Sequence, residues 1–344
     1  LCQMYLLEEL SFRWGERRKP SMSSFMEVKD LCVHYPIRGG FFNTVIDHVY
    51  AVDGVSMEFE KGKTYGLVGE SGSGKSTTGK AIIGLEKITS GKIIYEGEDV
   101  THQRRKRDSA YNRDIQMIFQ DSQSSMNPRK RVLDIIAEPI RNFMNMTVQE
   151  ERKRIIELLE IVGMSEEAMY KYPHQFSGGQ RQRLGIARAV ACNPKMIIAD
   201  EPVSALDLSV QAQVLNFMKD IQNEYGLSYL FISHDLGVVR HMCDHISIMY
   251  KGRFVETGSK NEIFKDPRHI YTKRLLSAIP NIAPESRLER KHKRRQVEVD
   301  YKKEQHKYYD EDGKVYPLSS VSSNHSVAIG SIEKGGYESV ENNS

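Results

Sequence analysis

One loop constrains the fold of this chain more than any other feature, because it joins an apolar strand to a helix through a run of glycines. The apolar residues Thr64–Val68 precede the loop, and residues 77–85 behind it have a helical pattern. The loop comprises Gly69, Glu70, Ser71, Gly72, Ser73, Gly74, Lys75 and Ser76, followed by Thr77. Its spacing matches the phosphate loop G-x-x-x-x-G-K-[ST], in which backbone N–H groups and a helix N-terminus surround phosphate oxygens. The sequence therefore predicts an α/β core that binds ATP or GTP here.

Further polar motifs follow this loop in a fixed order. Gln120 comes first, then Ser177, Gly178, Gly179 and Gln180, then Asp200 and Glu201, and last His234. Asp200 and Glu201 come directly after an apolar run at 195–199, and His234 follows a second run at 229–232. Ligands of open α/β sheets bind at the carboxyl ends of strands, so we expect these three side chains near the phosphates. The segment 177–180 predicts a second anion-binding site at a helix start.

These residue types suit phosphoryl transfer. Lys75 can neutralise charge on the outer phosphates, and Ser76 and Asp200 offer oxygen ligands for Mg²⁺. Glu201 can orient or deprotonate an attacking water, and His234 can hold that water or the γ-phosphate. The plain structural alternatives are a strand-end cap for Asp200 and a structural role for His234.

Composition limits the other classes of function. Over 344 residues, 49 basic and 46 acidic residues give a net charge of +3, which is too balanced to indicate nucleic acid or anionic lipid as a partner. Charges interrupt every apolar run, so we expect any membrane role to be peripheral. The four cysteines are far apart and form no C-x-x-C pair, which predicts neither disulfides nor a zinc site and fits a reducing cytoplasm.

The remaining patterns predict a helical insertion in an α/β core. We expect strands at 25–33, 51–59, 93–95 and 115–119, helical periodicity from about 134 to 169, an amphipathic helix at Leu208–Tyr225, a hairpin at 246–257 and a last helix at 270–279. In the insertion, Ile155, Leu158, Leu159 and Val162 lie on one helical face. Beyond Pro284 the chain becomes basic and then rich in Ser, Gly and Asn, so we expect a mobile tail.

Taken together, the motifs resemble the ATP-binding cassette of an ABC transporter, over about residues 25–280. Residues 176–181 are similar to the signature motif, Gln120 to the Q-loop, residues 204–207 to the D-loop and His234 to the switch histidine. The resemblance implies a P-loop NTPase with a RecA-like core, an antiparallel β subdomain and a helical subdomain. It also implies ATP and Mg²⁺ as ligands, with Gln120 serving both catalysis and the metal, and residues 69–77, 177–180 and Asp207 binding nucleotide.

The same resemblance implies a pair of cassettes arranged head to tail. Each ATP then lies between the phosphate loop of one subunit and the Ser177-type signature of the other. Tyr35 resembles the aromatic residue on which adenine stacks, although a core tyrosine, or contact through Phe41, Phe42 or Tyr50, are alternatives.

Finer likeness points to oligopeptide and dipeptide importers. Residues 116–129, 172–175 and 271–280 resemble these cassettes, and most of all the F-type of their two ATPase subunits; nickel importers share much of the pattern. The implied partners are two transmembrane permease subunits, a sibling ATPase and an extracellular peptide-binding protein, with the chain at the cytoplasmic face of the membrane. Many members of this group carry a cysteine cluster near the C-terminus that resembles an iron–sulfur site; no cysteine follows Cys243 here, so we predict no cluster.

We therefore expect four regions: an N-terminal extension at 1–24, with the natural start at Met22 or Met26; an ABC ATPase domain at 25–265 with its helical subdomain at about 121–185; an importer-type segment at 266–285; and the tail at 286–344. Two other functions are disfavoured. A soluble ABC ATPase of ribosomes or DNA usually has two cassettes or a long coiled-coil insertion, and this chain has neither. A catalytically idle cassette is disfavoured because every motif residue is present.

Overall fold

The computed structural model describes residues 24–102, 110–121, 125–278 and 287–330. The strands are β1 Ser24–Gly39, β2 Thr44–Glu60, β3 Thr64–Val68, β4 Ser90–Tyr95, β5 Glu98–Asp99, β6 Ile115–Ile118, β7 Met196–Asp200, β8 Ser228–Ser233, β9 His245–Tyr250, β10 Arg253–Ser259, β11 Leu318–Ser322 and β12 His325–Ala328. The α-helices are α2 Lys75–Ile83, α3 Ala110–Asp114, α4 Val132–Phe143, α5 Val148–Ile161, α6 Gly178–Val190, α7 Leu208–Tyr225, α8 Leu236–Met242, α9 Lys260–Lys265, α10 Ile270–Ser277 and α11 Arg287–Glu304. Short 3₁₀ turns occur at η1 Glu166–Tyr170, η2 Pro173–Gln175 and η3 Gln305–Lys307.

The larger sheet has the strand order β11-β12-β10-β9-β3-β8-β7-β6. Its centre is parallel, since β9, β3, β8, β7 and β6 pair in the same direction. Every residue of β3, β7 and β8 is buried, as expected where both faces of a parallel sheet are covered. The carboxyl ends of β3, β6, β7 and β8 therefore meet at one edge, and the loops that follow them carry the motifs found in the sequence.

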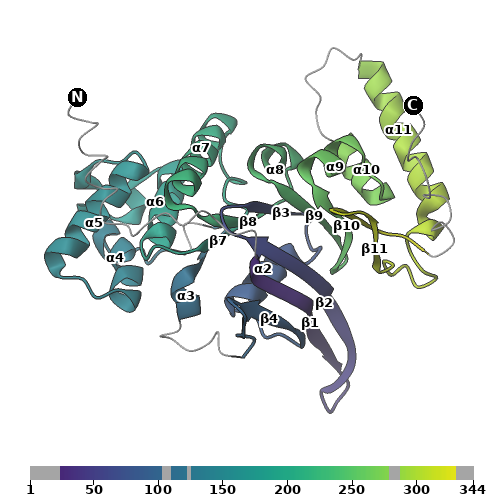
Figure 1. Ribbon diagram of the computed structural model, residues 1–344, viewed down its shortest axis with the longest axis horizontal. Coiled ribbons are helices and arrows are strands. Elements are labelled where there is room, and N and C mark those ends of the chain that lie inside the picture. The colour runs from purple at the N-terminus through teal and green to yellow at the C-terminus, as the bar shows by residue number, and fades with distance from the viewer. Residues whose placement is uncertain (1–23, 103–109, 122–124, 279–286, 331–344) are drawn as a thin grey trace.

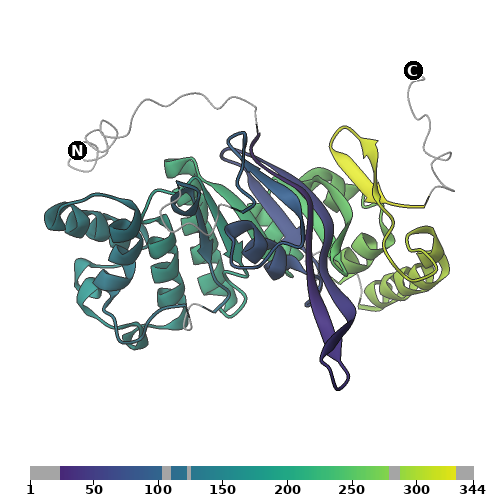
Figure 2. The ribbon, with the colours of Figure 1, turned by 90° about the horizontal axis from the view of Figure 1, so that it is seen from below.

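A smaller antiparallel sheet, with the order β2-β1-β4-β5, forms a second layer. Its apolar core includes Met26, Leu31 and Phe59, all fully buried. Beyond this core β1 and β2 continue as a two-stranded arm that projects from the body (Figure 2). Phe41 and Phe42 near its turn are 98% and 84% exposed.

The helices α4, α5 and α6 lie together on one side of the main sheet (Figure 1). The predicted helical face is confirmed, because Ile155, Leu158, Leu159 and Val162 are all buried. A capping box begins α5: the Thr147 side chain accepts the Glu150 N–H, and the Glu150 carboxylate accepts the Thr147 N–H. The expected core, β subdomain and helical subdomain are thus all present.

The C-terminal part of the chain differs from the expected mobile tail. Helix α11 follows α10, and the hairpin β11–β12 pairs with β10 and so extends the main sheet. The charged part of this attachment is buried: His325 Nε2 lies 2.8 Å from Glu256 Oε1, and both side chains are excluded from solvent. The prediction of a mobile tail from composition was wrong here, because a few buried residues provide the packing. Among them are Tyr308, Val327 and Ala328.

The expected N-terminal extension, the end of the importer-type segment and the last part of the tail lie mostly outside the described residues. In the described part of the chain, no helix has the length and apolar character needed to cross a membrane.

Candidate functional site

The glycine loop after β3 has the backbone that a phosphate cradle needs. Gly72 and Gly74 have positive φ angles of 79° and 106°, a region that side chains with a Cβ disfavour. A Cβ at Gly74 would also collide with the Ala51 carbonyl oxygen, and one at Gly69 with that of Met249. The loop is therefore packed between β2 and β9. Conformation favours glycine at Gly72, space requires it at Gly69, and both reasons apply at Gly74.

Lys75 begins α2 and lies inside this loop. Its side chain is 5% exposed, and Nζ donates to the Glu70 carbonyl at 2.8 Å and approaches Ser73 Oγ at 3.4 Å. Burial lowers the pKa of Lys75, and the carboxylates of Glu201 and Asp200 oppose that shift. The ammonium group is thus held within the loop by backbone and hydroxyl oxygens.

The structure brings together Ser76 and Asp200, two of the three residues expected to hold magnesium. The Ser76 hydroxyl at the start of α2 donates to Asp200 Oδ1 at the end of β7, at 2.8 Å. Asp200 is 3% exposed, and burial raises its pKa while the Ser76 hydrogen bond opposes the rise. Two oxygen donors in contact beside the phosphate loop form a set that suits Mg²⁺.

Glu201 is the centre of a second group of side chains. Its Oε2 accepts a hydrogen bond from Gln120 Nε2 at 2.9 Å, and its Oε1 lies 2.9 Å from His234 Nδ1. Glu201 also has a positive φ of 45°, and its N–H donates to the Ile232 carbonyl. The three residues follow β6, β7 and β8, and the strand-end argument had predicted this position for Glu201 and His234. A carboxylate held from both sides can accept a proton from water.

The signature segment begins α6, as expected. Ser177 Oγ accepts the Gln180 N–H at 3.3 Å, and Gln180 Oε1 accepts the Ser177 N–H at 2.9 Å. Gly179 lies against Val210, which a Cβ there would strike. Across the described residues, no hydrogen bond or ion pair joins segment 177–180 to loop 69–76. Ser177 and Gly178 are exposed at the helix start, free to meet another molecule.

Asp207 lies at the start of α7, and Tyr35 lies on β1 near α2. Asp207 caps α7, because its Oδ1 accepts the Val210 N–H at 3.0 Å. Tyr35 on β1 is 38% exposed. Burial and the Glu86 carboxylate raise the pKa of its hydroxyl, and Thr77 of α2 is also within hydrogen-bonding reach. Tyr35 thus lies beside the helix that follows the phosphate loop, while Phe41 and Phe42 lie near the turn of the arm.

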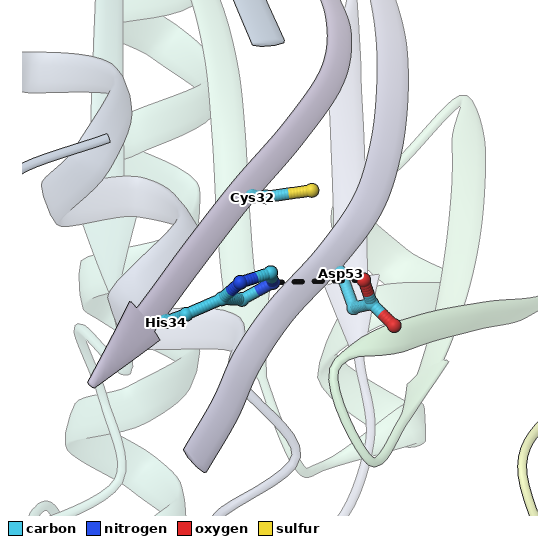
Figure 3. Close-up of side chains that lie close together, drawn as sticks. All are labelled: Cys32, His34 and Asp53. Atoms are coloured by element: carbon cyan, nitrogen blue, oxygen red, sulfur yellow. Dashed lines mark ion pairs between the residues drawn. The ribbon is translucent and has the colours of Figure 1, made fainter. Parts of the chain in front are cut away.

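Sequence reasoning did not find the group formed by Cys32, His34 and Asp53, which come from the neighbouring strands β1 and β2 (Figure 3). Their donor atoms lie within 4.8 Å of one another, a spacing that a metal ion could bridge. However, Asp53 Oδ2 already pairs with Arg253 Nη2 at 2.8 Å and Lys314 Nζ at 3.3 Å. Two cations neutralise this carboxylate, so we interpret it as a junction that ties β2 to β10 and to the turn that precedes β11.

Two further contacts on the phosphate loop were also missed. The Glu70 N–H donates to Tyr271 Oη at 3.1 Å, and the Gly252 N–H donates to the Ser73 carbonyl at 2.9 Å. Tyr271 belongs to a segment that the resemblance singled out, but no local pattern links it to a loop about two hundred residues earlier in the chain.

The chain matches two family models and several known proteins. The family described as "ABC transporter" matches residues 52–204, and the "Oligopeptide/dipeptide transporter, C-terminal region" matches residues 255–311. The oligopeptide transport ATP-binding protein OppF of Lactococcus lactis subsp. lactis (strain IL1403) is 59% identical over 322 residues, which are 94% of this chain and 100% of that protein. The dipeptide transport ATP-binding protein DppF of Escherichia coli (strain K12) is 47% identical over 77% of this chain and 79% of its own length.

Among solved structures, a dimeric ATP-binding cassette in a post-hydrolysis state, bound to ADP and Pi, has a TM-score of 0.59 and 28% identity. The match covers 68% of this chain and 98% of the chain in the solved structure.

Proposed function

Because this chain belongs to the ABC transporter ATP-binding proteins of the oligopeptide/dipeptide importer family, we propose that it hydrolyses ATP to drive the uptake of oligopeptides or dipeptides across the cell membrane. Within that family we assign it to the F-type of the two ATPase subunits. The observation that carries the catalytic part is the Glu201 carboxylate, held between Gln120 and His234 at 2.9 Å each and adjacent in sequence to Asp200.

In this proposal the loop 69–77 surrounds the phosphates and Lys75 neutralises the outer ones. Tyr35 stacks on adenine, since it lies beside Thr77 of the helix that begins at the loop. Mg²⁺ would be held by Ser76 and Asp200, with Gln120 contributing an oxygen. The bound ion would neutralise charge on the β- and γ-phosphates.

Glu201 then acts on the water that attacks the γ-phosphorus. As the new P–O bond forms and the bond between the β–γ bridging oxygen and the γ-phosphorus breaks, the water proton passes to the Glu201 carboxylate. Gln120 and His234 fix the direction of that carboxylate through the hydrogen bonds described above. The products are ADP and phosphate.

Hydrolysis needs a second cassette in this scheme. The exposed helix start at Ser177 to Gln180 supplies an anion-binding cap, and Asp207 lies at the neighbouring cap of α7. We propose that the cap covers the ATP of a sibling ATPase subunit, and that the sibling's cap covers the ATP bound here. The dimeric state of the related solved cassette supports this pairing.

The proposed partners are two transmembrane permease subunits, with an extracellular peptide-binding protein acting through the complex and no nucleic acid involved. The chain would then lie at the cytoplasmic face of the membrane as a peripheral protein. We assign residues 25–265 to the nucleotide-binding unit, with its helical subdomain at about 121–185 meeting the permeases, and residues 266–285 to the importer-type segment.

Peptide uptake by the intact complex tests this proposal. Wild type should import labelled di- and oligopeptides when ATP is present, and Lys75→Ala should abolish that import while leaving the complex assembled. A parallel assay with Ni²⁺ distinguishes a nickel importer. Uptake of peptide that is unchanged in Lys75→Ala would show that this subunit does not drive transport.

A further inference from the structure

The phosphate loop is held from its outer side by two contacts made from residues late in the chain. Tyr271 in α10 accepts the Glu70 N–H through its hydroxyl, at 3.1 Å, and Gly252 in the β9–β10 turn donates to the Ser73 carbonyl at 2.9 Å. These contacts secure the loop at two points, on either side of Ser71 and Gly72. Of these two contacts, the one from Tyr271 is made by a side chain, so a substitution at this position can remove it.

Glu70 connects this tyrosine to the proposed phosphate-binding lysine. The N–H of Glu70 is bound by Tyr271 Oη, and its carbonyl accepts from Lys75 Nζ at 2.8 Å. The backbone conformation of one residue therefore determines both where the loop is anchored and where the ammonium group is held. If the anchor is lost, Glu70 gains freedom to rotate, and the lysine loses a fixed partner.

The Tyr271 hydroxyl is suited to a permanent contact. Tyr271 is fully buried, and burial raises the pKa of its hydroxyl well above the usual range, so the group stays protonated and neutral. Its ring packs on Tyr250, the last residue of β9, with centroids 4.7 Å apart, and Tyr309 packs on Tyr250 in turn at 5.7 Å. The ring position is thus set by packing and not by the hydroxyl bond alone.

Buried polar contacts fix the start of α10. The Tyr271 N–H donates to His269 Nδ1 at 3.1 Å, and burial lowers the pKa of His269 to about 3, which keeps the ring neutral and that nitrogen able to accept. The backbone N–H groups of Arg268 and His269 both donate to the Glu256 carboxylate, which also pairs with His325 of β12. The C-terminal hairpin, α10 and the phosphate loop are therefore joined by one continuous set of contacts.

We propose that Tyr271 is a positioning residue for nucleotide binding, acting through Glu70 on Lys75. This inference rests on the proposed role of Lys75 at the phosphates. In this role the importer-type segment that follows the cassette is part of the phosphate site, because it orients the loop before ATP arrives.

The test measures the Kd for Mg²⁺-ATP of the purified full-length chain by equilibrium binding, with thermal unfolding recorded for each variant. Tyr271→Phe keeps the ring and removes the hydroxyl, and it should weaken ATP binding about 3- to 10-fold, the scale of one lost hydrogen bond. Tyr309→Phe is the matched control. It removes a hydroxyl from the same cluster of aromatic rings, but that hydroxyl bonds to Tyr301 and not to the loop. It should leave the Kd within about 2-fold of wild type.

A double-mutant cycle separates positioning from a general structural effect. Tyr271→Phe in a Lys75→Ala background should weaken ATP binding no further, since the lysine through which Tyr271 acts is gone. A full additional loss in that background, or a loss with Tyr309→Phe equal to that of Tyr271→Phe, would overturn the positioning role. If Tyr271→Phe binds ATP normally while Lys75→Ala does not, only the positioning role of Tyr271 is refuted. If Lys75→Ala itself binds ATP normally, the proposed nucleotide site is refuted as well.

Discussion

Replacing Glu201 by glutamine tests the proposed chemistry most directly, because the change removes a proton acceptor while keeping the shape of the side chain. Gln120 Nε2 donates to one carboxylate oxygen and His234 Nδ1 lies 2.9 Å from the other. The new amide can keep its oxygen toward Gln120 and donate its NH₂ to Nδ1 of a neutral His234 that carries its proton on Nε2. The site geometry should therefore survive the substitution.

Glu201→Gln removes the carboxylate that accepts the proton from the attacking water. We expect ATP turnover by the assembled complex to fall about 10²- to 10⁴-fold, the usual scale for removing a general base. ATP binding should be unchanged or tighter, because one negative charge near the triphosphate is removed. The assay is phosphate release at saturating Mg²⁺-ATP, combined with equilibrium ATP binding and thermal unfolding.

A suitable control is Glu98→Gln, which removes the charge of an exposed glutamate on β5, the outer strand of the smaller sheet. It should leave turnover within about 2-fold of wild type. Turnover by Glu201→Gln at the level of this control would refute the assignment of Glu201 as the base. A joint loss of turnover, ATP binding and unfolding temperature would instead indicate a structural role.

Three other outcomes are expected. Ser177→Asp should keep the N-cap of α6 and the unfolding temperature, because aspartate also caps helices. Its negative charge should repel phosphate and abolish the ATP-dependent pairing of cassettes measured by light scattering. Pairing at wild-type ATP concentrations would contradict the proposed anion-binding role of Ser177. Asp200→Asn should raise the Mg²⁺ concentration needed for half-maximal turnover, and an unchanged Mg²⁺ titration would remove Asp200 from the metal site. The hydrogen bond from the His325 ring to the Glu256 carboxylate raises the pKa of His325, so this pair stabilises the fold fully below about pH 6.5 and loses that contribution as pH rises through the elevated pKa. His325→Gln should therefore flatten the fall in unfolding temperature as the pH rises above about 6.5, and an unaltered slope would exclude His325 as its source.

The sequence predicted the parts of the site that depend on local pattern. Loop 69–76 and strand-end residues such as Asp200 and His234 could be placed because a strand, a turn and a helix have recognisable periods, and parallel strands end at one edge. Helix Leu208–Tyr225 was predicted with its observed bounds from its amphipathic pattern. In the structure Asp207 caps its start and Gly226 ends it with a φ of 63°.

Contacts between distant segments could not be predicted in this way. The bond from Glu70 to Tyr271 and the pairing of Glu256 with His325 depend on tertiary packing, and neither leaves a periodic signal. The C-terminal region was misjudged for the same reason, because its polar composition suggested mobility although residues such as Tyr308 and Val327 are buried. The length of the β1–β2 arm was likewise underestimated, since its outer half lacks a buried face to produce alternation.

The attachment of β12 to β10 also affects how this protein can be shortened. A chain that stops before residue 287 would lack the hairpin that covers the β10 edge, and it would lack Tyr309, which packs on Tyr250. The freed backbone groups of β10 would offer a template for a strand of another molecule. Truncated cassettes would therefore tend to aggregate on purification, and a low specific activity in such preparations would report poor solubility rather than a lost regulatory element.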